Sequence, residues 1–142
     1  MSTKENVALD RRVAEKVWNE GDMDVADQVF ASDVVLHGAA PGLPPGVEGV
    51  KAAVTAYRAA FPDLHVTNDD YVAEGDRVAS RWSWQGTHKG ELFGIPATGK
   101  QVTMTGISIM RVVDGKIAEV WSSSDQLSLM QQIGAAPTPG QN

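Results

Sequence analysis

His37 and Asp125 are the side chains whose type and place in the sequence best suit proton transfer. His37 ends a short apolar run that begins at Val34, directly before the Gly- and Pro-rich segment 38–46. A histidine imidazole ordinarily titrates near pH ~6.5, so it can donate or accept a proton at neutral pH. Asp125 lies where the last predicted strand passes into a final helix, so it can cap that helix, exchange a proton with a ligand, or do both. The sequence therefore predicts acid–base chemistry at these two positions, with a purely structural role as the alternative for each.

The other histidines and the absence of cysteine narrow the possible chemistry. His88 follows Gly86-Thr87 at a strand end, where we expect it to stabilise a turn, and His65 is expected to face solvent. The 142 residues include no Cys, which excludes thiolate catalysis, disulfides and Cys-ligated metals. We expect no metal site.

Large apolar side chains are spaced as in the wall of an apolar cavity. Side chains along a strand alternate between its two faces. Trp82 and Trp84 are therefore expected to share one face of their strand, whereas Trp121 and Ser122 point to opposite faces of the last strand. If Ser122 lines a cavity, Trp121 faces outward, where an aromatic side chain is typical of a subunit contact. The residues expected to line the cavity, or alternatively to form ordinary core, are Trp18, Tyr57, Trp82, Trp84, Met104 and Met110.

Hydrophobic periodicity places these side chains on an ordered series of elements. Apolar residues recur with helical spacing over about 3–20, 24–30 and 47–61, and with strand spacing over 34–37, 64–73, 78–85, 102–113 and 116–123. Asp114-Gly115 between two β-rich runs predicts a tight hairpin, and a short helix is expected after Asp125. This order predicts an α+β fold, with helices segregated to one face of a curved antiparallel sheet that can cup a cavity.

Length and charge limit the class of protein. We expect one domain over residues 1–134 and a flexible tail over 135–142. The net charge of −6 argues against nucleic acid as a partner, because nucleic-acid affinity rests on clustered Lys and Arg. A signal peptide and a run of about 18 apolar residues are both missing, so we expect no membrane association and a cytoplasmic protein.

A set of loop motifs resembles one known family. The motifs are Asn19-Glu20-Gly21-Asp22, Phe61-Pro62-Asp63, Gly75-Asp76-Arg77-Val78, Gly86-Thr87-His88, Gly94-Ile95-Pro96, Thr98-Gly99-Lys100, residues 111–117 (RVVDGKI) and Gln131-Gln132-Ile133-Gly134. Together they resemble the SnoaL-like polyketide (ester) cyclases of the nuclear-transport-factor-2-like superfamily, over about residues 5–134. The resemblance implies a cone-shaped curved antiparallel sheet, three N-terminal helices on its concave face, and a short C-terminal helix.

The resemblance also implies a reaction. Cyclases of this family close a ring by an intramolecular aldol step on an aromatic polyketide ester, without a metal or organic cofactor. Aligned on residues 111–117, the catalytic aspartate of the family falls on Ser122 and its partner histidine on Ser108. An unassisted hydroxyl is too weak a base, so both serines are expected to be polar cavity wall, with His37 and Asp125 supplying the proton transfer in their place.

Alternatives to cyclisation remain open at this stage. One is isomerisation or epoxide hydrolysis in the same cavity, although Arg81 and Arg111 do not stand at a recognisable spacing from Asp70 and Asp125. Another is a non-catalytic domain that binds a ligand or forms dimers. We expect the ligand to be a small apolar or aromatic carbonyl compound, and the protein to form a homodimer through its sheet.

Overall fold

The computed structural model of the chain describes residues 2–136. Its helical elements are α1 (Thr3–Arg12), the π-helical segment η1 (Val13–Trp18), α2 (Met23–Val29), α3 (Val47–Ala60) and α4 (Gln126–Gln132). Its strands are β1 (Phe30–His37), β2 (His65–Glu74), β3 (Arg77–Thr87), β4 (Gln101–Val113) and β5 (Lys116–Ser124). The predicted α+β order is confirmed, and most boundaries lie within a few residues of the expected ones.

The first helix is continuous but changes its winding. Ser2 and Glu5 form a reciprocal capping box at its start, which satisfies free backbone N–H groups. After Arg12 the helix widens into η1, and the Asn19 backbone N–H bonds the Ala14 carbonyl five residues earlier, at 3.0 Å. Such π-helical turns are frequent at functional sites because they rotate side chains out of the ordinary helical phase.

The sheet has the strand order β1-β5-β4-β3-β2, and it is mixed rather than purely antiparallel. Strands β2 to β5 form the predicted antiparallel meander. β1 joins β5 in parallel, with His37 opposite Trp121, which corrects the antiparallel expectation. The correction has a topological cause: α3 and three further strands intervene between β1 and β5, and a connection of that length can bring two strands together in the same direction.

Strand β1 is longer and more exposed than the brief buried strand predicted over residues 34–37. It starts at Phe30, and Phe30 and Val34 are buried, but Val35 remains 49% exposed. β1 occupies an edge of the sheet, so one of its faces packs on the helices and the other meets solvent. This asymmetry determines where His37 points.

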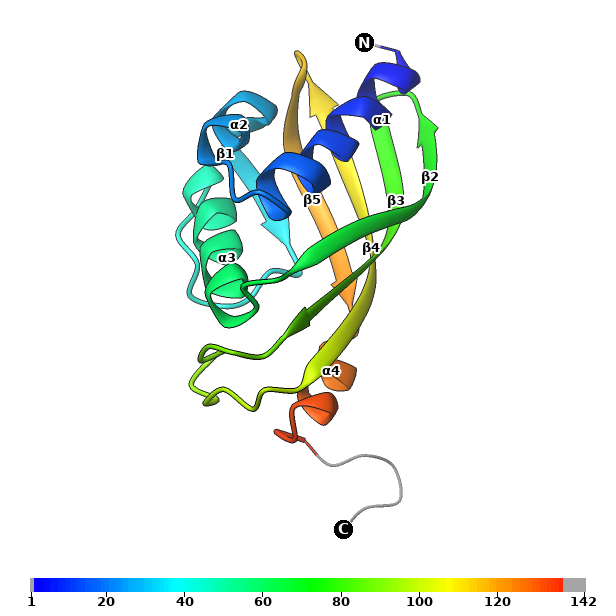
Figure 1. The fold of residues 1–142 in the computed structure, drawn as a ribbon. Coiled ribbons are helices and arrows are strands. Elements are labelled where there is room, and N and C mark those ends of the chain that lie inside the picture. Colours follow the sequence, from blue (N-terminus) through cyan, green and yellow to red (C-terminus); the bar gives the residue numbers. More distant parts are fainter. Residues whose placement is uncertain (1, 137–142) are drawn as a thin grey trace.

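Helices α1, α2 and α3 lie together on one side of the curved sheet, and α4 lies beyond the far ends of β4 and β5 (Figure 1). Two groups of buried apolar side chains fill the space between the layers. One is centred on α2, α3 and β5, and the other on Phe61, β4 and α4; Trp18 packs against both. The helices therefore cover the concave face of the sheet, as the resemblance implied.

Turns and termini agree with the local sequence. Asp114 and Gly115 both have positive φ, 49° and 78°, as a two-residue hairpin of this hand requires. Of the predicted tail, Ala135 and Ala136 donate backbone hydrogen bonds to the Met130 carbonyl, and 137–142 lie outside the described residues. Within residues 2–136, no helix has the length and apolar character needed to cross a membrane.

Candidate active site

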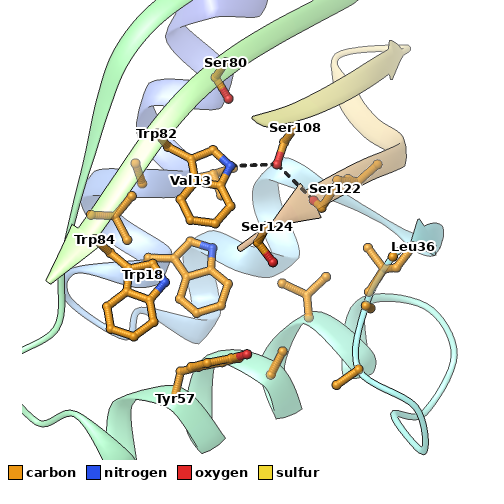
Figure 2. Close-up of a pocket in the computed structure, with 18 of the residues that line it drawn as sticks. Val13, Trp18, Leu36, Tyr57, Ser80, Trp82, Trp84, Ser108, Ser122 and Ser124 are labelled. Atoms are coloured by element: carbon orange, nitrogen blue, oxygen red, sulfur yellow. Dashed lines mark hydrogen bonds between the residues drawn. The ribbon is translucent and has the colours of Figure 1, made fainter. Parts of the chain in front are cut away.

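A cavity of about 210 Å³ lies between α1, η1 and α3, the loop after β1, and the concave face of the sheet. Most of its wall is apolar, and a few polar groups interrupt it, as is usual for sites that bind small molecules. Figure 2 shows aromatic rings at one end and a group of serines on the strands. All eight residues predicted to bind substrate line this cavity: Trp18, Tyr57, Trp82, Trp84, Met104, Ser108, Met110 and Ser122.

Strand alternation accounts for the side chains that enter the cavity. On β5, Val120, Ser122 and Ser124 line the cavity, and the intervening Trp121 does not. The prediction that Trp121 and Ser122 point to opposite faces is therefore confirmed. Trp121 is partly covered within its own chain, because the His37 ring stacks on it at 5.3 Å and the Arg77 guanidinium lies 5.1 Å from its ring centre.

Tyr57 is the centre of the aromatic end of the cavity. Its ring makes edge-on contacts with the rings of Trp18, Trp84 and Phe93, at centroid distances of 6.1, 6.0 and 5.8 Å. Burial raises the pKa of the Tyr57 hydroxyl, which accepts a 3.1 Å hydrogen bond from the Gln126 side-chain amide. These rings form an apolar wall suited to a flat ligand.

Three strands contribute one inward row of serines. Ser80 on β3 is paired with Ser108 on β4, and Ser108 with Ser122 on β5. The Trp82 indole Nε1 donates to Ser108 Oγ at 2.9 Å, and Ser108 Oγ lies 2.9 Å from Ser122 Oγ (Figure 2). These three side chains carry three polar protons and share two hydrogen bonds, so one hydroxyl proton is left to donate to a ligand.

Gly106 leaves free the space that the Trp82 indole occupies. The two residues are paired across β3 and β4, and a Cβ at position 106 would collide with the six-membered ring of Trp82. A glycine opposite a large aromatic side chain lets the ring lie across the neighbouring strand. The position of the Nε1 donor thus depends on a residue that makes no polar contact itself.

Asp10 is the cavity residue that the sequence interpretation missed. It lies on α1, lines the cavity, and is only 3% exposed. Burial raises the pKa of Asp10 to about 6, and a hydrogen bond with Ser80 acts in the opposite direction. The signal was present in the sequence: Asp10 precedes Val13 by three residues and Val17 by seven, so it lies on the apolar face of the predicted helix.

The sequence profile described as SnoaL-like polyketide cyclase matches residues 8–133 of the chain. The chain belongs to the SnoaL-like polyketide cyclase family. It is 34% identical over 143 residues to the aklanonic acid methyl ester cyclase DnrD of Streptomyces peucetius, covering 98% of this chain and 97% of DnrD. Aklanonic acid methyl ester cyclase DauD of Streptomyces sp. (strain C5) is 33% identical, with 94% of this chain and 84% of DauD covered. The structure of TsrD from Streptomyces laurentii superposes with a TM-score of 0.87 at 30% identity, covering 96% of this chain and 99% of TsrD.

His37 borders the cavity of this SnoaL-like chain, but its imidazole is held by residues of the outer face. Its Nε2 lies 2.7 Å from Glu119 Oε2, and its ring stacks on Trp121. Glu119 and Trp121 alternate along β5 with the cavity residues Val120 and Ser122, so the imidazole lies on the outer face of the sheet. His37 thus lies at the cavity as expected, but its ring turns outward, because His37 ends an edge strand in register with Trp121. Its role in proton transfer stays a prediction.

Asp125 lies outside the cavity, and the geometry favours its structural role as a helix cap. Its Oδ1 accepts the Ser128 backbone N–H at 3.0 Å, which caps α4. It borders a shallow outer groove rather than the cavity of the SnoaL-like fold. His37 and Asp125 are therefore not brought together, and neither enters our proposal for the reaction.

The two remaining histidines lie where they were expected. His88 is fully buried beside Phe61, and its Nδ1 lies 3.0 Å from Thr98 Oγ1, so it stabilises the loop between β3 and β4. His65 is exposed at the start of β2. Among the described residues 2–136, no group of three or more His, Asp or Glu side chains is arranged to hold a metal ion.

Proposed function

We propose that this SnoaL-like protein is a cofactor-independent cyclase that closes a ring within an apolar, carbonyl-bearing polyketide by an intramolecular aldol step. The observation that carries the proposal is the Trp82–Ser108–Ser122 chain, which offers one free hydroxyl proton inside a mostly apolar cavity. Such a donor can hold the oxygen on which negative charge develops when a carbonyl compound forms an enolate. The names of DnrD and DauD support the same substrate class.

The remainder of the cavity suits the folding of a flexible carbonyl chain. Trp18, Tyr57 and Trp84 give one end flat apolar surfaces against which a preformed aromatic ring can stack. The serine row lies on the strand wall, so the reactive carbonyl groups would meet their donors on one side only. This positioning is expected to account for most of the acceleration of ring closure, because the two reacting carbons belong to one molecule.

The direct test is turnover of aklanonic acid methyl ester by the purified chain. We expect saturable conversion to a ring-closed isomer of unchanged mass, followed by liquid chromatography and mass spectrometry against a reaction without protein. Incorporation of labelled water oxygen into a diol product would instead identify a hydrolase. The structure gives little support to that alternative, because Arg81 is exposed near Asp69 and Arg111 is paired with Glu119 on the outer face.

The second candidate function is ligand binding without turnover. It is favoured by the chemistry of the serine row, since the hydroxyl groups of Ser108 and Ser122 are poor bases without an activating partner. A ligand-dependent rise in melting temperature without any consumption of the ester would support this reading and contradict the cyclase.

We further propose that the outer face of the sheet pairs with a second copy of the chain. Ile107 and Ile109 on β4 are 54% and 38% exposed, and Ile109 lies opposite Trp121 in the register with β5. Apolar and aromatic side chains grouped in this way are typical of the core of a subunit contact. The cavity lies on the other, concave face of the sheet, so a dimer of this kind would not cover its lining.

A further inference from the structure

Asp10 combines burial with an unsatisfied carboxylate oxygen on the wall of the cavity. The residue is 3% exposed, and its Oδ2 has no hydrogen-bond partner among the described residues. Buried carboxylates are rare, and nearly all have partners, because desolvating a charged group without compensation is costly. A cavity-lining carboxylate with a free oxygen is therefore a candidate for a group that acts on a ligand.

We propose that Asp10 takes a proton from the carbon beside a carbonyl group of the bound substrate and returns a proton when the ring closes. This inference rests on the proposed function, since it names the acid–base group that ring closure in this cavity needs. It takes the place of His37, whose imidazole is held by Glu119 and Trp121 at the cavity border, and of Asp125, which caps α4.

The position of Asp10 relative to the serine row supports this role. The carboxylate adjoins Ser80, which is paired with Ser108, which in turn is paired with Ser122. Side chains opposite each other on neighbouring strands lie about 4.5–5.5 Å apart at Cβ. The proton acceptor on α1 is thus connected through Ser80 and Ser108 to the Ser122 hydroxyl, and both groups line one cavity.

The surroundings of Asp10 suit both of its protonation states. Ser80 hydrogen-bonds the carboxylate and favours the ionised form. Asn6 lies one helical turn earlier, and its buried Oδ1 is also without a partner, so it offers an acceptor for a protonated carboxyl group. The charged and titratable groups that act on Asp10 are Arg11 on its own helix and Tyr71 on β2. Since burial raises the pKa to about 6, the carboxyl group is mostly ionised at neutral pH yet can be reprotonated.

The proposed step balances without an external reagent. The α-carbon loses its proton to the Asp10 carboxylate, and the resulting enolate oxygen accepts the free hydroxyl proton of the serine row as a hydrogen bond. The enolate carbon then forms a carbon–carbon bond to a second carbonyl carbon of the same molecule. The alkoxide produced takes the proton from Asp10, so the product is an isomer of the substrate and the enzyme returns to its starting state.

The test measures two reactions of the 142-residue chain with aklanonic acid methyl ester. One is ring closure, and the other is exchange of the α-hydrogen of the ester with deuterium from heavy water. In the wild type we expect both rates to fall on the acid side with a midpoint near the pKa of Asp10, about 6. Asp10→Asn should lower both rates by roughly 10²–10⁴-fold and abolish this loss of rate at low pH, the acid limb of the pH profile.

Ser80→Ala removes the hydrogen bond that favours the ionised form of Asp10, so it should move the acid limb to higher pH. Asp125→Asn is the matched control, because it makes the same change at a helix cap outside the cavity, and should behave as wild type.

The possible results separate this inference from the proposed function. Ring closure that persists in a folded Asp10→Asn variant, within about fivefold and with an unchanged acid limb, overturns the role of Asp10 and leaves the cyclase standing. Asp10-dependent deuterium exchange without ring closure supports Asp10 and overturns the cyclase. Wild-type protein that neither closes the ring nor exchanges the α-hydrogen overturns both. Melting temperatures of all variants, measured in the same buffer, show whether a lost rate reflects lost folding.

Discussion

At the residue scale, Ser122 controls where the free hydroxyl proton of the cavity lies. When Ser108 accepts from Trp82 and donates to Ser122, the proton left for a ligand belongs to Ser122. Ser122→Ala moves that free proton back to Ser108, which is one hydrogen bond, 2.9 Å, away.

We therefore expect Ser122→Ala to lower kcat about 10²-fold, because donors misplaced by an ångström or more hold the transition-state oxygen poorly. Steady-state kinetics on the methyl ester measure the effect, with Ser123→Ala on the outer face of β5 as the control. Equal kcat values for Ser122→Ala and wild type would remove the serine row from the mechanism.

A second residue-scale prediction concerns stability and Asp10. Its pKa in the folded protein, about 6, lies above its ordinary value of 3.8. The stabilisation that comes from keeping Asp10 protonated is complete below about pH 4 and is lost as the pH rises through about 6. Asp10→Asn cannot ionise, so it should be more stable than wild type at pH 8, by up to about 3 kcal/mol, and should lose that advantage near pH 4.

Denaturant unfolding at the two pH values tests this prediction, since the free energy of unfolding is obtained for both proteins under each condition. A variant that is less stable than wild type at pH 8 would contradict it. The expected pattern, lower activity with higher stability at alkaline pH, is typical of a residue retained for function rather than for folding.

At the element scale, the pairing of β3 with β4 fixes the donor chain through Gly106. We expect Gly106→Ala to destabilise the protein by about 1–3 kcal/mol, because the new methyl group and the Trp82 ring compete for one space. It should also lower turnover, because the displaced indole cannot keep its 2.9 Å bond to Ser108.

A double-mutant cycle isolates this effect. In a Trp82→Ala background the ring is absent, so adding Gly106→Ala should change the free energy of unfolding little. If Gly106→Ala lowers the free energy of unfolding equally in both backgrounds, the glycine is needed for the backbone conformation and not for the Trp82 ring.

The same elements explain how far the sequence could be interpreted. Alternation along β5 predicted correctly that Trp121 and Ser122 point to opposite faces of the sheet, because that pattern is local. The outward direction of His37 depends on parallel pairing with a strand far along the chain, which no local pattern encodes. Asp10 lay on a recognisable apolar helix face, but its proximity to Ser80 required the packing of α1 on β3.

At the scale of the whole molecule, the exposed isoleucines of β4 predict the oligomeric state. We expect a homodimer in solution, and Ile107→Glu should convert it to monomer, because a buried charge without a partner opposes association. Sedimentation equilibrium measures the mass of each species. Leu127→Glu on α4, a residue outside the strands that is 62% exposed, is the matched control and should leave the dimer intact. A wild-type protein that is monomeric at high concentration would contradict the expectation.

The parallel pairing of β1 with β5 has a consequence for how the chain acquires its cavity. β1 leaves the ribosome long before the partner strand that completes its hydrogen bonds has been made, and contacts between such distant segments form slowly because a long loop must close first. Until then Phe30 and Val34 have no sheet to pack on, and the nascent chain presents an apolar strand with an open edge. The cavity is therefore completed only near the end of synthesis, and recovery of folded protein should depend more on the rate of that last pairing than on the stability of the finished domain.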